Sequence, residues 1–138
     1  MATYNKFEAF VEHLAEKVHN LGSDTLTVAL CAAANAPVAT NSVLADLTQI
    51  SYTNLSSRVL TQASSAQTSG TYKLVLNDLV LTASGGSVAA FRYIVIYNDT
   101  AASDQLICWY DYGSSITLAD GDTLTLDFSA ANGVLQIV

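Results

Sequence analysis

After Gly22 the sequence breaks into short β-prone segments that recur at a spacing of roughly ten residues. Turn signals such as Gly85-Gly86, Asp120-Gly121 and Asn132-Gly133 separate these segments. Because short strands joined by tight turns pair with their neighbours, the pattern predicts an antiparallel β-sandwich or barrel. The expected strands are 25–33, 58–68, 71–82 (with a bulge or turn at Asn77-Asp78), 91–97, 105–112, 123–128 and 134–138.

The N-terminal stretch has a different periodicity, which predicts a helix over residues 5–21. Phe7, Phe10, Leu14 and Val18 recur at helical spacing on one apolar stripe, and Gly22 supplies a stop signal. A chain of 138 residues makes one domain. The sequence therefore predicts a single mainly-β domain over 1–138: one N-terminal amphipathic α-helix, then an antiparallel β-sandwich or jelly-roll-like fold over 24–138. A further short helix is expected over 42–47.

Two of the expected strands, 91–97 and 105–112, are apolar on both faces, whereas the outer face of an ordinary sandwich is polar and exposed to solvent. Only 12% of the residues are charged and 51% are hydrophobic. The helix is expected to cover part of this apolar surface, and a neighbouring subunit the rest, which predicts a homo-oligomer. The outer face carries either the isoleucines with Trp109 or the tyrosines. The candidate interface residues are Phe7, Phe10, Leu14, Tyr93, Tyr97, Trp109, Tyr110 and Tyr112.

Charge argues against nucleic acid as a partner. The chain has five Lys and Arg residues and twelve Asp and Glu residues, which gives a net charge of −7, and the cations are scattered along the sequence. No apolar run reaches the length of about 18 residues typical of a membrane span, so no membrane partner is expected. The N-terminus lacks the cationic and apolar segments of a signal peptide, which predicts synthesis in a cytoplasm.

No motif for catalysis, cofactor binding or metal binding is present, so neither an enzyme nor a cofactor is expected. His13 and His19 are expected to lie well apart around the predicted helix, which disfavours a shared ligand. Two questions stay open from the sequence: whether Asp99 and Asp104 meet an ion in their loop, and whether Cys31 and Cys108 pair.

Four segments carry a resemblance to a known class of proteins. They are 4–15 (YNKFEAFVEHLA), 91–100 (FRYIVIYNDT), 106–113 (LICWYDYG) and 116–128 (ITLADGDTLTLDF). Together they resemble small virion structural proteins of tailed bacteriophages, of the capsid decoration (cement) or tail-associated kind. The resemblance covers most of the chain and carries no catalytic signature.

The resemblance implies a non-enzymatic decoration protein that binds and stabilises neighbouring subunits of the major capsid protein, or other virion proteins. It is expected to be made in the host cytoplasm and to reside in the virion. A trimer is the first choice of oligomer, by analogy with capsid sites on threefold axes. The alternative is a tail or fibre component that binds another virion protein or, through Tyr and Trp, a host glycan.

Overall fold

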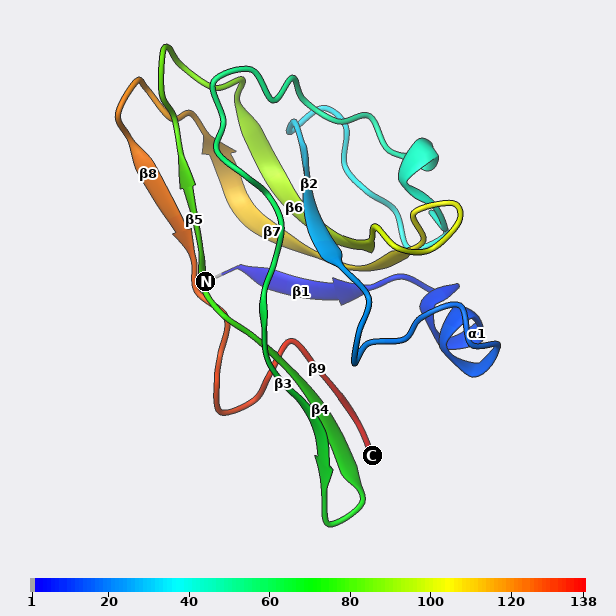
Figure 1. The fold of residues 1–138 in the computed structure, drawn as a ribbon. Helices are drawn as coiled ribbons and strands as arrows, with labels where there is room; N and C mark the ends of the chain where they lie inside the picture. The colour runs from blue at the N-terminus through cyan, green and yellow to red at the C-terminus, as the bar shows by residue number, and fades with distance from the viewer. Residues whose placement is uncertain (1) are drawn as a thin grey trace.

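The computed structural model describes residues 2–138, and it is mainly β with antiparallel sheets and one short α-helix near the N-terminus. The main sheet has four strands in the order β1-β7-β6-β2 (Figure 1). Their bounds are β1 Thr3–Lys6, β2 Leu26–Cys31, β6 Phe91–Asn98 and β7 Leu106–Ile116.

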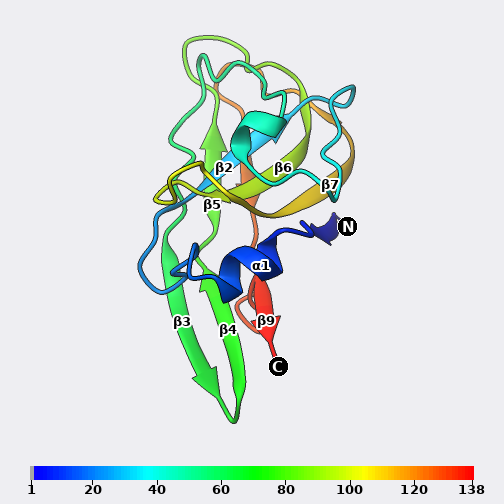
Figure 2. The same ribbon diagram turned by 90° about the vertical axis from the view of Figure 1, so that its right-hand side faces the viewer.

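Two smaller sheets complete the sandwich-like fold. Strands β5 (Leu79–Thr82) and β8 (Thr123–Leu126) pair antiparallel and pack on one face of the main sheet. The other small sheet has the order β3-β4-β9 and projects from the body as an arm in both views (Figures 1 and 2). Its strands are β3 Gln62–Thr68, β4 Thr71–Leu76 and β9 Leu135–Ile137.

The larger core lies between the main sheet and the smaller sheets. Strand β8 contributes through the alternation that its sequence predicted, with Leu124 and Leu126 turned inward and Thr123 and Thr125 exposed. Fully or nearly fully buried members of this core include Leu26, Val28, Leu30, Leu74, Leu81, Val88, Phe91, Ile94, Ile96 and Ile107.

A second core covers the opposite face of the main sheet. Side chains from that face pack with Ala39, Leu44 and Leu47, which belong to the long connection after β2 and to the short 3-10 helix η1 (Leu44–Asp46). The expectation that the N-terminal helix and a neighbouring subunit cover the two-sided strands is therefore wrong for most of this face. The chain covers it with its own loop. The buried members of this second core are Phe7, Ala29, Cys31, Tyr93, Val95, Tyr97, Leu106 and Trp109.

The predicted helix over 5–21 is also wrong in its extent. Helix α1 spans only Phe10–Ala15, and the N-terminal part of the predicted helix is replaced by β1 (Thr3–Lys6), in which Tyr4 lies opposite Tyr110 of β7. The main sheet offers β1 a free edge, and pairing there satisfies backbone groups that a helix would otherwise satisfy internally. At the other end, Lys17 takes a left-handed conformation with φ 66° and turns the chain back.

The remaining elements agree closely with the strand pattern in the sequence. Asn77 and Asp78 separate β4 from β5, and a short helix lies within 42–47, as expected. Cys31 and Cys108 are free and buried, on strands that are separated in the sheet by β6. In the described part of the chain, no helix has the length and apolar character needed to cross a membrane.

Candidate interaction surface

The structure divides the eight residues expected at an interface into two groups. Five of them are buried within the chain itself and contribute to its two cores: Phe7, Phe10, Tyr93, Tyr97 and Trp109. Leu14 and Tyr110 are half-buried, and the side chain of Tyr112 is 47% exposed. Only these last three remain accessible to a partner.

The tyrosines of the two apolar strands also do not share one face, although strict alternation predicted that they would. They are Tyr93, Tyr97, Tyr110 and Tyr112. In the register of β6 and β7, Tyr110 lies opposite Ile94, whereas Trp109 lies opposite Val95. Tyr110 therefore packs against the larger core and Tyr93 belongs to the second core. Register between strands is a non-local property, so the sequence of either strand alone could not supply this assignment.

An open groove lies between β7 and β8, and Tyr110 and Tyr112 line it. Its volume is about 140 Å³. The opposite wall is made by Leu124, Leu126 and Phe128, which follow the inward face of β8 to the edge of the sandwich. We call the surface formed by these five residues the aromatic groove. In this groove the apolar interior of the sandwich reaches solvent.

Aromatic packing holds the floor of the groove. The ring of Tyr110 meets that of Tyr4 edge to face, with centroids 5.5 Å apart, and lies 6.3 Å from the ring of Phe128. Edge-to-face pairs are a favoured arrangement of aromatic rings. Burial raises the pKa of both Tyr4 and Tyr110, so these phenols stay neutral at physiological pH.

A large irregular bulge in β7 begins at Tyr112. Tyr93 pairs with Asp111 and Phe91 pairs with Ile116, so residues 112–115 of β7 oppose the single residue Arg92. Gly113 adopts φ 95°, a conformation that other residues rarely take. A bulge redirects side chains out of the regular alternation, and here it occurs at the residue that forms the exposed rim of the groove.

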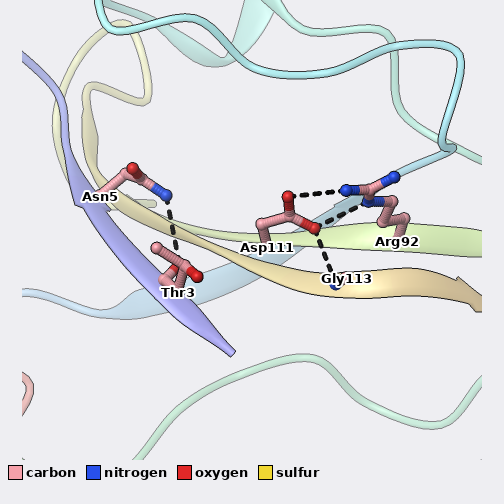
Figure 3. A network of polar contacts seen from close by, with 5 residues as sticks. All are labelled: Thr3, Asn5, Arg92, Asp111 and Gly113. Atoms are coloured by element: carbon pink, nitrogen blue, oxygen red, sulfur yellow. Dashed lines mark hydrogen bonds and ion pairs between the residues drawn. The ribbon is translucent and has the colours of Figure 1, made fainter. Parts of the chain in front are cut away.

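An ion pair fixes the start of this bulge (Figure 3). The guanidinium of Arg92 donates from Nε to Asp111 Oδ1 at 2.7 Å and from Nη2 to Oδ2 at 2.9 Å. The backbone N–H of Gly113 donates to the same carboxylate at 2.8 Å. The hydrogen bonds from Arg92 lower the pKa of Asp111, so the carboxylate remains charged. Asp111 therefore ties the strand before the bulge to the glycine inside it.

The two histidines lie close together, and the expectation that they are well apart is wrong. Because the chain turns back at Lys17, the rings of His13 and His19 reach a centroid separation of 5.8 Å. His19 is 4% exposed, and its Nδ1 accepts a hydrogen bond from Asn98 Nδ2 at 3.1 Å. Asn98 Nδ2 also donates to Asp24. This cluster links the segment after α1 to the end of β6.

No metal-binding group emerges from these side chains. Within residues 2–138, no set of three or more His, Cys, Asp or Glu side chains is placed to hold an ion. Asp99 instead accepts a hydrogen bond from the hydroxyl of Thr27 at 3.1 Å. Burial raises the pKa of the Cys31 thiol to about 11 and that of Cys108 to about 12, so neither is a ready nucleophile.

Sequence reasoning identified Tyr110 and Tyr112 but missed Leu124, Leu126 and Phe128 as groove residues. The alternation of β8 marked them correctly as inward-facing. What it did not reveal is that β8 stands at the edge of a two-stranded sheet, where inward-facing side chains stay partly accessible. Comparison of the chain with protein-family models, curated proteins and solved structures found no match.

Proposed function

We propose that the chain is a non-enzymatic structural protein of a phage virion, a capsid decoration protein that binds neighbouring subunits of the major capsid protein through the aromatic groove. The groove is the observation that carries this proposal. Tyr112 is 47% exposed beside half-buried Leu124 and Leu126. Tyrosine and apolar side chains at the centre of a contact, with a polar rim, are typical of protein–protein interfaces.

The chemistry of the groove favours a protein side chain as its occupant. Three of the five residues that define it, Leu124, Leu126 and Phe128, have no polar side-chain atom, and the phenol of Tyr110 lies in a desolvated environment. An apolar anchor from a capsid subunit would bury this surface. Many identical sites on a shell then add modest single affinities into firm attachment.

A host glycan is the second candidate, as for a tail or fibre protein. The exposed ring of Tyr112 supports it, because aromatic faces stack on the apolar faces of sugars. Sugar recognition also needs polar groups beside the ring, and among the described residues the groove offers chiefly Thr125 and Asp127. We therefore rank this candidate below a capsid partner.

Two measurements test the proposal. Quantitative mass spectrometry of purified virions should give a copy number in the hundreds, comparable with a decoration protein, whereas a tail part is present in few copies. Added to shells that lack it, the purified chain should co-sediment with them. Tyr112→Ala should weaken this binding by about tenfold, since interface tyrosines often contribute more than 1 kcal/mol.

Val38→Ala is the matched control, because Val38 is 53% exposed on the connection after β2, away from the groove. It should bind shells like the unmodified protein. Equal binding by all three proteins, or binding to a glycan array that Tyr112→Ala abolishes, would contradict the capsid proposal.

A further inference from the structure

The outer strand of the arm, β3, has one edge without a partner. β3 pairs with β4 along one side. Among residues 2–138, no strand, isolated bridge or other backbone hydrogen bond occupies the opposite side of residues 63–67. The strand has seven residues, whereas the end strands β1 and β8 have four each. A free edge of this length is a template for another strand.

The hairpin turn determines which backbone groups face this edge. Ser69 and Gly70 form a two-residue loop, with φ 51° and 84°, and Thr68 pairs with Thr71 across it. In such hairpins the flanking pair is hydrogen-bonded, and bonded pairs then alternate along the ladder. Thr68 and Ala66 therefore bond to β4. The N–H and C=O groups of Ser65 and Gln67 point outward, toward the free edge.

The arm lacks the devices that normally protect a free edge. Natural edges carry charged residues, above all lysine, or proline. None of the residues of β3 is charged or proline, and Lys73 on the central strand β4 is the sole charged side chain in the three arm strands. The molecule as a whole carries a net charge of −7. Two copies therefore repel each other least where their arms meet.

We propose that β3 pairs antiparallel with β3 of a second copy, about a two-fold axis at Ala66. In this register Ala66 lies opposite Ala66 of the second copy, and Ser65 lies opposite Gln67 of the second copy. The two outward-facing residues of each copy then form four backbone hydrogen bonds. The side chains nearest the axis are those of alanine, which allow the strands to approach at the short separation of a non-hydrogen-bonded pair, about 4.5 Å between Cα atoms.

The neighbourhood of the arm favours this register over one that is centred nearer the body. Gln62 donates from its side chain to the carbonyl of Leu21, and Ser65 Oγ lies 3.6 Å from the Cβ position of Gly22. The loop at 20–22 therefore lies close to the first half of β3. The second half and the tip project freely (Figure 2). Within the described part of the chain, a contact over residues 64–68 meets this loop only at the side chain of Ser65, and the edge over 63–67 makes no other backbone hydrogen bond.

The proposed contact has closed two-fold symmetry and a small area. A two-fold axis joins identical surfaces, so the pairing uses up the free edge of both copies and forms a dimer rather than a fibre. Only five residues of each chain meet, so we expect a weak dimer that forms at protein concentrations on the order of 100 µM. The dimer uses none of the groove residues and does not depend on the proposed function. It also differs from the trimer that analogy suggested.

Disulfide trapping tests the register directly. In Ala66→Cys the new cysteines of two copies lie opposite each other, within the Cα separation of about 4.4–6.8 Å that a disulfide spans. Mild oxidation should give a covalent dimer, and the buried Cys31 and Cys108 should not interfere. Ser64→Cys is the matched control. Ser64 is exposed as well, but its two copies are four residues out of register, about 13 Å apart, and should not cross-link.

A mixture of two single variants adds a positive test. Ser64 of one copy lies opposite Thr68 of the other in the proposed register. Ser64→Cys and Thr68→Cys should therefore cross-link with each other when mixed, and far less when each is oxidised alone. Cross-linking of Ser64→Cys alone as readily as Ala66→Cys would overturn the register.

Sedimentation velocity tests the dimer without new cysteines. Ala66→Lys places two ammonium groups side by side at the axis and should return the dimer to monomer. Ala102→Lys makes the same change on the exposed loop between β6 and β7 and should leave the dimer intact. Circular dichroism of both variants checks that they fold. A monomer at every concentration, or an oligomer that Ala66→Lys does not affect, would overturn the proposal.

Discussion

Arg92 and Asp111 meet across the β6–β7 pair as a two-pronged ion pair, with 2.7 Å from Nε to Oδ1 and 2.9 Å from Nη2 to Oδ2. Arg92 is the single residue of β6 that faces the bulge of β7, and Asp111 is the last residue before the bulge. Because Asp111 also accepts the N–H of Gly113, the pair holds both the strand and the irregular segment that presents Tyr112. A planar guanidinium suits this task, since its fork matches both carboxylate oxygens at once.

Asp111→Ala should loosen the bulge without unfolding the protein. The substitution removes the acceptor of the Gly113 N–H, so that amide should exchange its hydrogen for deuterium several-fold faster, together with its neighbours over 112–115. Native-state exchange followed by mass spectrometry measures this. Asp127→Ala, on an exposed residue beside the groove, is the control and should leave the exchange of 112–115 unchanged. Unaltered exchange in Asp111→Ala would mean that the ion pair does not hold the bulge.

Phe7→Ala should be strongly destabilising. The ring of Phe7 is fully buried, 4.5 Å from that of Trp109 by centroid, in the second core. Removing a buried phenylalanine side chain costs about 3–5 kcal/mol through lost burial and the cavity left behind. Leu14→Ala should cost less, because Leu14 is only half-buried against the larger core. Urea unfolding measures both; equal losses would show that the loop over the second core does not enclose Phe7.

The stability of the protein should fall as the pH decreases from about 6.5 to about 4. Burial, and then the neighbouring His13, lower the pKa of His19 to about 4 from its ordinary value of 6.5. Between these values the unfolded chain binds a proton that the folded protein does not, so acid favours unfolding; above pH 6.5 the contribution is fully present. The loss attributable to His19 is on the order of 3 kcal/mol.

The physical cause of this loss is specific. A protonated His19 carries a hydrogen on Nδ1, which then faces the Asn98 Nδ2 donor. Asn98 has no alternative orientation, because its Oδ1 accepts the backbone N–H groups of Thr100 and Ala101. Urea unfolding at several pH values should show a shallower pH dependence in His19→Gln than in the unmodified protein. Parallel curves for the two proteins would exclude His19 as the source.

The native thiols should be inert. Cys31 and Cys108 are both fully buried, and their raised pKa values leave almost no thiolate at neutral pH. An aromatic disulfide reagent should therefore release no colour from the folded protein and react with both thiols in urea. Rapid reaction of one thiol in native buffer would indicate local opening of β2 or β7.

The strands of this fold could be predicted from the sequence because their signals are local. The alternation over 123–128 and the turn residues that follow each strand depend only on neighbouring positions. The N-terminal helix was over-extended for the opposite reason. Tyr4 and Asn5 become a strand because β7, far along the chain, offers them an edge. Helical spacing in the sequence contains no information about that edge.

The candidate site was predictable only in part. Tyr110 and Tyr112 attract attention as aromatic residues on a two-sided strand, and both line the groove. Tyr93, Tyr97 and Trp109 have the same local character, yet the connection after β2 folds over them. Because Ala39, Leu44 and Leu47 lie in a segment with little periodicity, their role as a cover follows from the tertiary fold alone.

The pairing of β1 with β7 has a consequence for synthesis. Tyr4 faces Tyr110 in the finished sheet, so about one hundred residues must leave the ribosome before the first strand finds its partner. The N-terminal segment, together with Phe7, lacks its packing partners until β7 has emerged. Contacts this distant along the chain are formed slowly. The main sheet is therefore completed only once β7 has emerged, and the N-terminal segment of a nascent chain is open to chaperones until then.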